Sequence, residues 1–246
     1  MERVIYRGNL KKKEIQPPEL IAEYWKRVEE DLNKMAHKNF LPFSELKSYD
    51  LKFKKYGMDY VYCKELDGIF LSTRPDEDVI KRYYHDSESR SFWLNEILKK
   101  TQEMRTKEII DPQLNWIKEI IMQHLKNKDQ KYNIFESHAV HWLYYLSSNI
   151  INNSEYYFYE PYFPIKADTL KSSKLNTIDK LEKEYFEVSF LFEALERSIN
   201  PFKLLDDIYE SLKIGGLCFI TCLLSSGFEA KILGEHSNVF NPPEKM

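Results

Sequence analysis

Two histidines and a glutamate gather in one short stretch, and their spacing is the feature of the sequence closest to a metal site. Glu136, His138 and His141 lie within residues 136–142. Imidazoles three residues apart share one face of a helix, and imidazole and carboxylate groups both bind zinc. Short motifs of this kind are weak evidence, because histidines near aromatic-rich helices are usually packing or surface residues. We therefore expect no metal here.

The remaining reactive side chains form no catalytic constellation. The three cysteines, Cys63, Cys218 and Cys222, are too few for a disulfide framework or a zinc site made of thiolates alone. Cys218 and Cys222 lie in an apolar run that we expect to be a buried strand, where thiols are inert. Pairs of adjacent tyrosines indicate packing rather than a platform for stacking bases. No catalytic residue is identified from the sequence.

Composition excludes several classes of protein. The chain has 246 residues, 43% of them hydrophobic, with a net charge of −3, and a dedicated nucleic-acid binder is usually strongly basic. No apolar run has the length of a membrane-spanning helix, and no signal peptide opens the sequence. We therefore expect a cytoplasmic protein that binds neither nucleic acid nor membrane.

The elements that must position any site divide into two regions. Residues 1–130 are predicted to be helical, with a β-hairpin around Gly57 and a third short strand at residues 69–71. Helices are expected after Pro17-Pro18 and over residues 79–98. A further helix is predicted to begin at Asp111-Pro112, a capping residue followed by proline.

Residues 131–246 alternate between strand and helix, which predicts a parallel sheet. The predicted strands cover residues 132–135, 156–159, 188–192 and 217–224. A helix opens at Pro201 and is predicted to end at Gly215-Gly216, because glycine adopts the left-handed cap conformation readily. The run 217–224 is continuously apolar, which is typical of a strand buried on both faces.

Part of this second region resembles a known family. Residues 186–197, Phe-Glu-Val-Ser-Phe-Leu-Phe-Glu-Ala-Leu-Glu-Arg, are followed by Asn200-Pro201 and by Leu-Lys-Ile-Gly-Gly at 212–216. This succession resembles the fourth strand, helix and fifth strand of class I S-adenosylmethionine-dependent methyltransferases. Arg197 stands where that family commonly has histidine, and Ile214 where it commonly has proline.

The first region resembles a subset of the same family. In that subset a cysteine-rich knuckle precedes an Arg-Pro step and a Tyr-Tyr stretch, here residues 73–75 and 83–84, and then Glu-Met-Arg at 103–105. Only Cys63 of the knuckle is present, so no metal is expected there. The resemblance covers roughly residues 60 to 246. It implies a Rossmann-like α/β fold, a mostly parallel sheet with helices on both faces, beside the N-terminal helical region with its hairpin.

The resemblance also implies a cofactor, S-adenosylmethionine, and its site. The implied cofactor-binding residues are Glu136, Ser137, His138, Glu160 and Glu193. Of these, Glu160 takes the place of the acidic residue that accepts hydrogen bonds from the ribose hydroxyls.

The loop that follows Glu136 departs from the family pattern. His138, Val140 and Trp142 occupy positions where the family has small residues, which let the backbone approach the cofactor. A β-branched valine resists positive φ, and an indole ring fills space that the cofactor needs. We therefore expect S-adenosylmethionine to bind weakly or not at all.

Two functions from different classes follow from these features. One is a methyltransferase that acts on a small molecule or a sugar precursor. The other is a catalytically inactive binding or structural module with the methyltransferase fold. The family continues into two further strands after the fifth, so we expect this chain to be a fragment or a shortened form. Its strand at 217–224 would then lie at an exposed sheet edge and pair in a homodimer.

Overall fold

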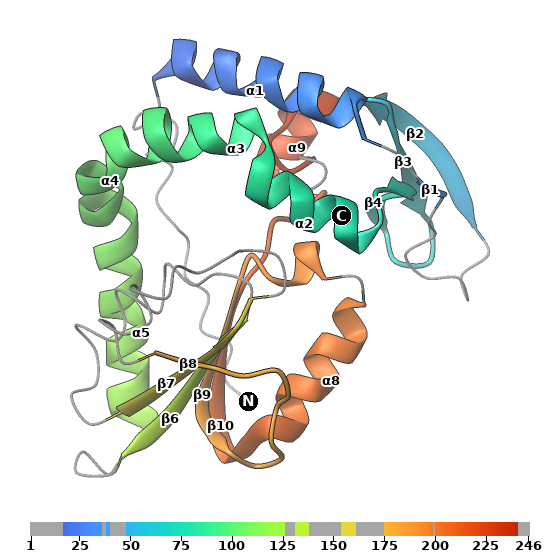
Figure 1. Cartoon of the computed structure of the whole chain (residues 1–246). Helices are drawn as coiled ribbons and strands as arrows, with labels where there is room; N and C mark the ends of the chain where they lie inside the picture. The colour runs from blue at the N-terminus through green and yellow to red at the C-terminus, as the bar shows by residue number, and fades with distance from the viewer. Residues whose placement is uncertain are drawn as a thin grey trace.

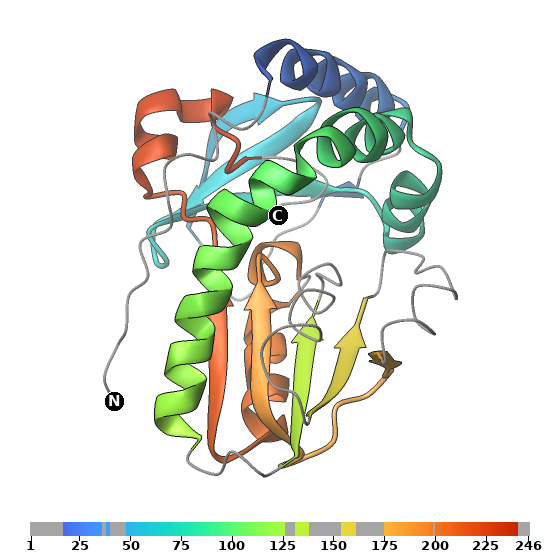
Figure 2. The same cartoon turned by 90° about the vertical axis from the view of Figure 1, so that its left-hand side faces the viewer.

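The computed structural model describes residues 17–35, 38–39, 48–125, 131–137, 154–160, 175–198 and 200–240. They form a parallel sheet flanked by helices, and above it a second group of helices around a small antiparallel sheet (Figures 1 and 2). The prediction of an α/β protein with a parallel sheet is confirmed, and the arrangement is that of a Rossmann-like fold.

Five parallel strands make the larger sheet, in the spatial order β10-β9-β6-β7-β8. Their bounds are Tyr132–Ser137 for β6, Ser154–Tyr159 for β7, Leu175–Thr177 for β8, Phe186–Phe192 for β9 and Leu212–Thr221 for β10. The chain therefore enters the sheet at its middle strand, β6, and adds β7 and β8 on one side. It then crosses to the other side of β6 and adds β9 and β10. The four strands predicted for residues 131–246 all lie in this one sheet, and β8 is a further strand that was not predicted.

Each face of the sheet is covered by one helix of the described residues, α5 (Asp111–His124) or α8 (Pro201–Ser211) (Figure 1). The α5 face buries Ile117 and Ile121 of the helix against the aromatic side chains of β7, β9 and β10, and the Trp116 and Phe219 rings meet edge to face at 5.6 Å. On the opposite face, Ile208 of α8 packs with Phe135 and Leu191. The sheet is thus the middle layer of three.

Helix α8 begins as the sequence predicts and ends earlier. Asn200 caps it, because its side-chain oxygen accepts a hydrogen bond from the Lys203 amide at 2.9 Å, and Pro201 occupies the first turn. The prediction that Gly215-Gly216 ends the helix is wrong. The helix ends at Ser211, and the chain enters β10 at Leu212, which already pairs with Phe186.

The glycine pair instead makes an irregularity inside β10. The register with β9 shifts between Leu212 and Leu217, and Gly215 has φ +80°, a conformation in which a side chain is strained. Beyond it, β10 is not buried on both faces as predicted. Phe219 is buried against α5, whereas Ile220 is 47% exposed and Cys218 and Cys222 are both exposed. The strand also ends at Thr221 rather than at 224.

Position in the sheet explains this difference. In the described part of the chain β10 pairs only with β9, so it is an edge strand, as predicted for residues 217–224. Strand β9 is buried at every position, because it lies between β10 and β6 and has helices on both faces. A continuous apolar run is therefore not by itself a sign of a central strand.

The second group of elements contains the predicted hairpin. Strands β2 (Tyr49–Lys55), β3 (Met58–Cys63) and β4 (Gly68–Leu71) form an antiparallel sheet. Tyr56 and Gly57 make the two-residue turn between β2 and β3, both with positive φ, as tight hairpin turns require. Residues 73–74, expected only to end the third strand, form β5 (Thr73–Arg74), which pairs with β1 (Lys38–Asn39).

Helices surround this small sheet. Helix α1 (Pro18–Asn33) follows Pro17 as predicted and buries Tyr24, Val28 and Leu32. After α2 (Glu77–Asp86), a continuous helical segment runs from Glu88 to His124, through α3 (Glu88–Phe92), η2 (Trp93–Leu98), α4 (Lys99–Arg105), η3 (Thr106–Ile110) and α5. Its two η segments are π-helical.

Helix α5 begins at Asp111 with Pro112 in its first turn, as predicted, but Asp111 does not cap it, because α5 continues directly from the π-helical segment before it. Ile110, the residue before α5, is itself helical, and Asp111 continues the preceding π turn without capping it. Proline lacks an N–H group and crowds the carbonyl four residues earlier. The wider π turn at Thr106–Ile110 accommodates Pro112, so the chain bends here without a break.

After β10 the chain returns to the small sheet. Helix α9 (Phe228–Leu233), the 3-10 turn η5 (Gly234–His236) and Phe240 pack beside β2, β3 and α1 (Figures 1 and 2). Phe240 is 3% exposed and packs edge-on against the stacked rings of Phe53 and Tyr60, with ring centres 5.1 and 5.6 Å away. The two ends of the described chain therefore share one hydrophobic core.

One buried carboxylate joins three strands at the amino end of the parallel sheet. Glu187 of β9 is 6% exposed, accepts a hydrogen bond from the Asn133 amide of β6 at 2.7 Å and forms an ion pair with Lys213 of β10. The pairing with β6 begins one residue later, between Ile134 and Val188. Glu187 therefore accepts a hydrogen bond from the Asn133 amide, which lies just before the paired residues of β6 and β9.

We predict that Glu187→Ala lowers the free energy of unfolding by about 2 kcal/mol, because it leaves the Asn133 amide without its charged acceptor. The half-exposed Lys213 adds little to that figure. Urea denaturation followed by circular dichroism measures the change. The matched control is Asp207→Ala, which removes an exposed ion pair with Lys203 on α8 and is expected to cost less than about 0.5 kcal/mol. Equal losses in the two variants would contradict the role given to Glu187.

Candidate functional site

The strand order places a candidate site at the carboxyl ends of β6 and β9. The chain leaves β6 toward β7 and β8 on one side, whereas β9 and β10 lie on the other. In open parallel sheets a crevice forms at such a reversal, outside the carboxyl ends of the strands, and ligands bind there. Three predicted site residues, Glu136, Glu160 and Glu193, are at the carboxyl ends of β6, β7 and β9.

Glu136 and Ser137 end β6 and are both fully buried. Glu136 pairs in register with Phe158 of β7 and Phe190 of β9, whose rings belong to the core under α5. A carboxylate in such a place costs free energy unless other groups satisfy it. Its burial at the central strand end marks Glu136 as the deepest polar group of the candidate site.

Glu160 directly follows β7 and is partly buried, and beside it Tyr159 is 39% exposed. Burial raises the pKa of the Tyr159 hydroxyl, and the negative charges of Glu160, Glu77 and Asp179 raise it further. Glu77 is the first residue of α2, and Asp179 follows β8. Three carboxylates from different parts of the chain therefore act on the hydroxyl at the end of β7.

The end of β9 has an unusual backbone. Glu193 has φ +51°, a left-handed conformation that is uncommon outside glycine. Its amide donates hydrogen bonds to the carbonyl and the side-chain oxygen of Thr221, at 2.9 and 3.2 Å. The turn that follows brings Arg197 within 3.9 Å of the Glu193 carboxylate. Backbone strain of this kind gathers at functional sites, where surrounding contacts hold it in place.

The remaining predicted site residue, His138, lies outside the described residues. So do His141, Val140 and Trp142, and with them the loop on which the expected weak binding depends. Within the described ranges no group of three His, Cys, Asp or Glu side chains has the geometry of a metal site.

Sequence reasoning missed Tyr159, Glu77 and Asp179. Tyr159 had a visible signal, since it immediately precedes Glu160 at a predicted strand end. Glu77 had none, because only the folding of α2 over the sheet brings it near β7.

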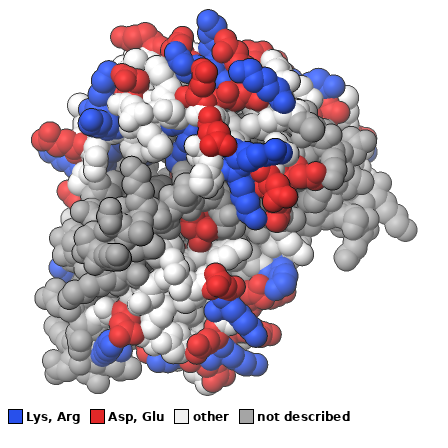
Figure 3. All heavy atoms as spheres, viewed as in Figure 1, with Lys and Arg blue, Asp and Glu red and all other residues white. Residues whose placement is uncertain are grey.

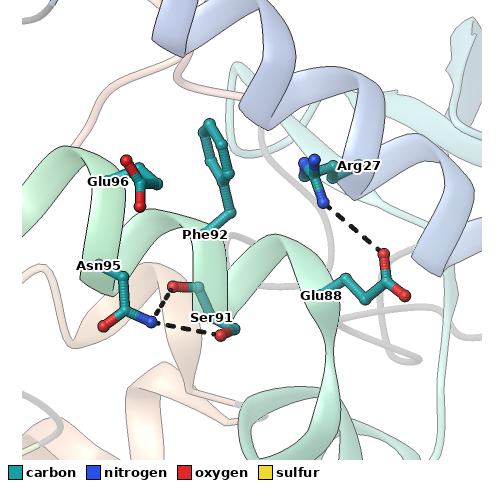
Figure 4. A pocket seen from close by; sticks show the side chains of 6 residues that line it. All are labelled: Arg27, Glu88, Ser91, Phe92, Asn95 and Glu96. Atoms are coloured by element: carbon teal, nitrogen blue, oxygen red, sulfur yellow. Dashed lines mark hydrogen bonds and ion pairs between the residues drawn. The ribbon is translucent and has the colours of Figure 1, made fainter.

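A shallow hollow lies elsewhere, between α1 and the α3–η2 segment (Figure 4). Its volume is about 260 Å³, below the usual range of ligand pockets. Arg27 crosses it, with its guanidinium 4.8 Å from the Phe92 ring centre and paired with Glu23 and Glu88. Because these charges satisfy one another within the two helices, the hollow is a packing feature of a helix crossing.

Comparison with known proteins adds no family to this description. No protein-family model matches the sequence, and no curated protein is significantly similar to it. Among the described helices, none combines the length and hydropathy needed to cross a membrane.

The backbone at Glu193 yields a stability prediction. Glu193→Gly should change the free energy of unfolding by no more than about 0.5 kcal/mol, because glycine adopts positive φ without strain. Glu193→Val should lower it by about 1–2 kcal/mol, since a β-branched side chain resists this conformation. Both variants lose the same carboxylate, so the difference between their free energies of unfolding reports the strain of the backbone at this position. Thermal unfolding curves with equal midpoints would show that φ at this position is relaxed in solution.

Proposed function

We propose that this chain is an S-adenosylmethionine-dependent methyltransferase-like protein with its ligand site at the carboxyl ends of β6, β7 and β9. The observation that carries the proposal is the parallel strand order, with carboxylates ending the central strands on both sides of its reversal. It agrees with the resemblance of residues 186–216 to the methyltransferase family.

The described residues fit the nucleoside half of such a cofactor. Glu160 is partly exposed at the end of β7, so its carboxylate can accept hydrogen bonds from two ribose hydroxyls. The half-exposed Tyr159 ring lies beside it as an apolar surface. Glu193, which follows β9 on the other side of the reversal in strand order, offers a second carboxylate.

When bound, the cofactor supplies a sulfonium methyl group, and the acceptor we propose is a small molecule or a sugar precursor. The protein then contributes orientation, holding the acceptor in line with the bond that breaks. Several carboxylates lie at this edge, and none of them is assigned as a general base. The proposal therefore names binding residues and no catalytic residue.

The glycine-free loop at residues 137–142 favours a second candidate, an inactive binding or structural module that keeps the fold. Glu160 contributes one charge-assisted site, worth about 1.5–3 kcal/mol. Micromolar affinity requires about 8 kcal/mol. Whether the chain is an enzyme or an inactive module, we therefore expect it to bind S-adenosylmethionine weakly unless the loop supplies contacts of its own.

Titration calorimetry with S-adenosylmethionine and its demethylated product tests the site. We predict a dissociation constant in the millimolar range, equivalent to about 4 kcal/mol, and loss of the binding heat in Glu160→Ala. The matched control is Glu155→Ala at the amino end of β7, where Glu155 forms an ion pair with Lys131. This variant should bind S-adenosylmethionine as tightly as the wild type does.

The outcomes separate the candidates. Tighter binding after His138, Val140 and Trp142 are replaced by glycine would support the loop as the cause of weak affinity. Micromolar binding by the wild type, abolished by Glu160→Ala, would show an intact methyltransferase pocket and contradict the expected weakness. Equal affinities for the wild type and Glu160→Ala would overturn the site itself.

We further propose that the chain forms a homodimer through β10, or aggregates through it on concentration. Residues 214–224 carry no charged side chain, whereas natural edge strands commonly use charge to prevent pairing. Ile220 and Leu224 are 47% and 61% exposed along this edge.

Light scattering over a range of concentrations should give a mass that rises toward that of a dimer. Ile220→Lys is expected to weaken association at least tenfold, since it places a charge on the pairing edge. Ile232→Lys on α9, also at an exposed isoleucine, is the control and should leave association unchanged. A wild type that stays monomeric at high concentration would contradict the proposal.

A further inference from the structure

The chain changes course at Glu193, directly after β9. Side chains alternate along this strand, with Phe190 and Phe192 on the α5 side of the sheet and Leu191 on the α8 side. An uninterrupted strand would turn the side chain of residue 194 to the α5 side. Ala194 is instead buried in the core under α8, because the left-handed backbone of Glu193, with φ +51°, redirects the chain. This kink therefore decides where the Glu193 carboxylate lies.

The kink is held from the neighbouring strand. Phe192 pairs in register with Thr221, the last residue of β10. One residue further along, the Glu193 amide donates to two oxygens of Thr221, the carbonyl at 2.9 Å and the hydroxyl at 3.2 Å. Any residue could supply the carbonyl bond. The hydroxyl bond depends on the side chain at position 221, and threonine and serine can both make it.

A second contact ties the same turn to the chain that leaves β10. The Glu196 carboxylate accepts a hydrogen bond from the Leu223 amide at 3.3 Å. Within the turn, Arg197 and Glu193 lie 3.9 Å apart, and their side chains are only 15% and 32% exposed. The backbone on both sides of the Glu193 carboxylate is therefore fastened to β10 and to the segment after it.

The overall charge of the molecule gives a ligand little guidance. The net charge is −3, and on the face shown in Figure 3 acidic and basic side chains are interspersed. A ligand at the carboxyl edge of the sheet is therefore oriented by individual groups, and the position of each carboxylate there matters.

We propose that Thr221 is a positioning residue for this edge: its hydroxyl holds the left-handed backbone of Glu193 and so fixes the place from which that carboxylate meets a ligand. The inference rests on the proposed function, which gives Glu193 a binding role. Strained backbone persists only where surrounding contacts hold it, and a binding group must be held within about 0.5 Å of its productive position. Thr221 acts through Glu193 and is assigned no contact with the ligand.

Hydrogen exchange at the Glu193 amide tests the hydroxyl bond without any ligand. Thr221→Val keeps the size and the carbonyl of the residue but removes the hydroxyl, so this amide should exchange about threefold faster. Thr221→Ser keeps the hydroxyl and should exchange as the wild type does. The Phe190 amide, in the middle of β9, is the internal reference. An unchanged rate at Glu193, or an equal acceleration at Phe190, would overturn the proposal.

Binding of S-adenosylmethionine, followed by NMR, tests whether the positioning matters. Thr221→Val should weaken binding about threefold when Glu193 is present, the equivalent of one weak hydrogen bond. In the Glu193→Gly background the same change should have no effect, because no carboxylate remains to be positioned. Thr221→Ser should bind as the wild type does. An equal loss in both backgrounds would show a general structural role and contradict the proposal.

These measurements separate the inference from the function on which it rests. A wild type that binds no S-adenosylmethionine would reject the proposed function, and with it the positioning role. Binding that is abolished by Glu160→Ala but unaffected by Thr221→Val would leave the function standing and reject the role of Thr221 alone. If Thr221→Val fails to fold, Thr221→Ala removes the same hydroxyl and is expected to give the same two results.

Discussion

Burial of β9 is the constraint on which the rest of the structure depends. Every residue of Phe186–Phe192 is buried, and alternate side chains of this one strand enter the cores on both faces of the sheet. The only acidic residue among them, Glu187, is satisfied by β6 and β10 at once. Because β10 is parallel to β9, the connection between them must cross a face of the sheet, and α8 makes this crossing, whereas α5 precedes β6 and covers the opposite face.

The same arrangement concentrates polar groups at one edge. Parallel strands end together, and their carboxyl ends here carry Glu136, Glu160 and Glu193. Each sits in a different environment: Glu136 is fully buried, Glu160 is partly exposed, and Glu193 has a strained backbone tied to Thr221. A ligand at this edge would therefore meet acidic groups at different depths, which is a means of orienting it.

How far the sequence predicts this structure depends on which interactions decide each element. Local patterns were enough for the hairpin around Gly57, for the start of α8 at Pro201 and for the parallel strands other than β8. They failed at Gly215-Gly216, because pairing of Leu212 with Phe186 ends the helix before the glycines are reached. At Asp111-Pro112 they gave the start of α5 but not its cap, since a π-helical segment leads directly into the helix. Burial of β10 was overestimated from its continuous apolar run, although the same strand was correctly expected at an edge of the sheet.

The candidate site shows the same division between local and distant information. Its three glutamates follow predicted strands, so they were accessible to sequence reasoning. Glu77 comes near Tyr159 only because α2 lies over the strand ends. The N-terminal region is joined to the segment after β10 by contacts far apart in the chain: Ser225 with Ile69, and Phe240 against Phe53 and Tyr60. The N-terminal region therefore does more than flank the sheet. It supplies Glu77, whose charge acts on the Tyr159 hydroxyl, and it receives the chain that leaves β10.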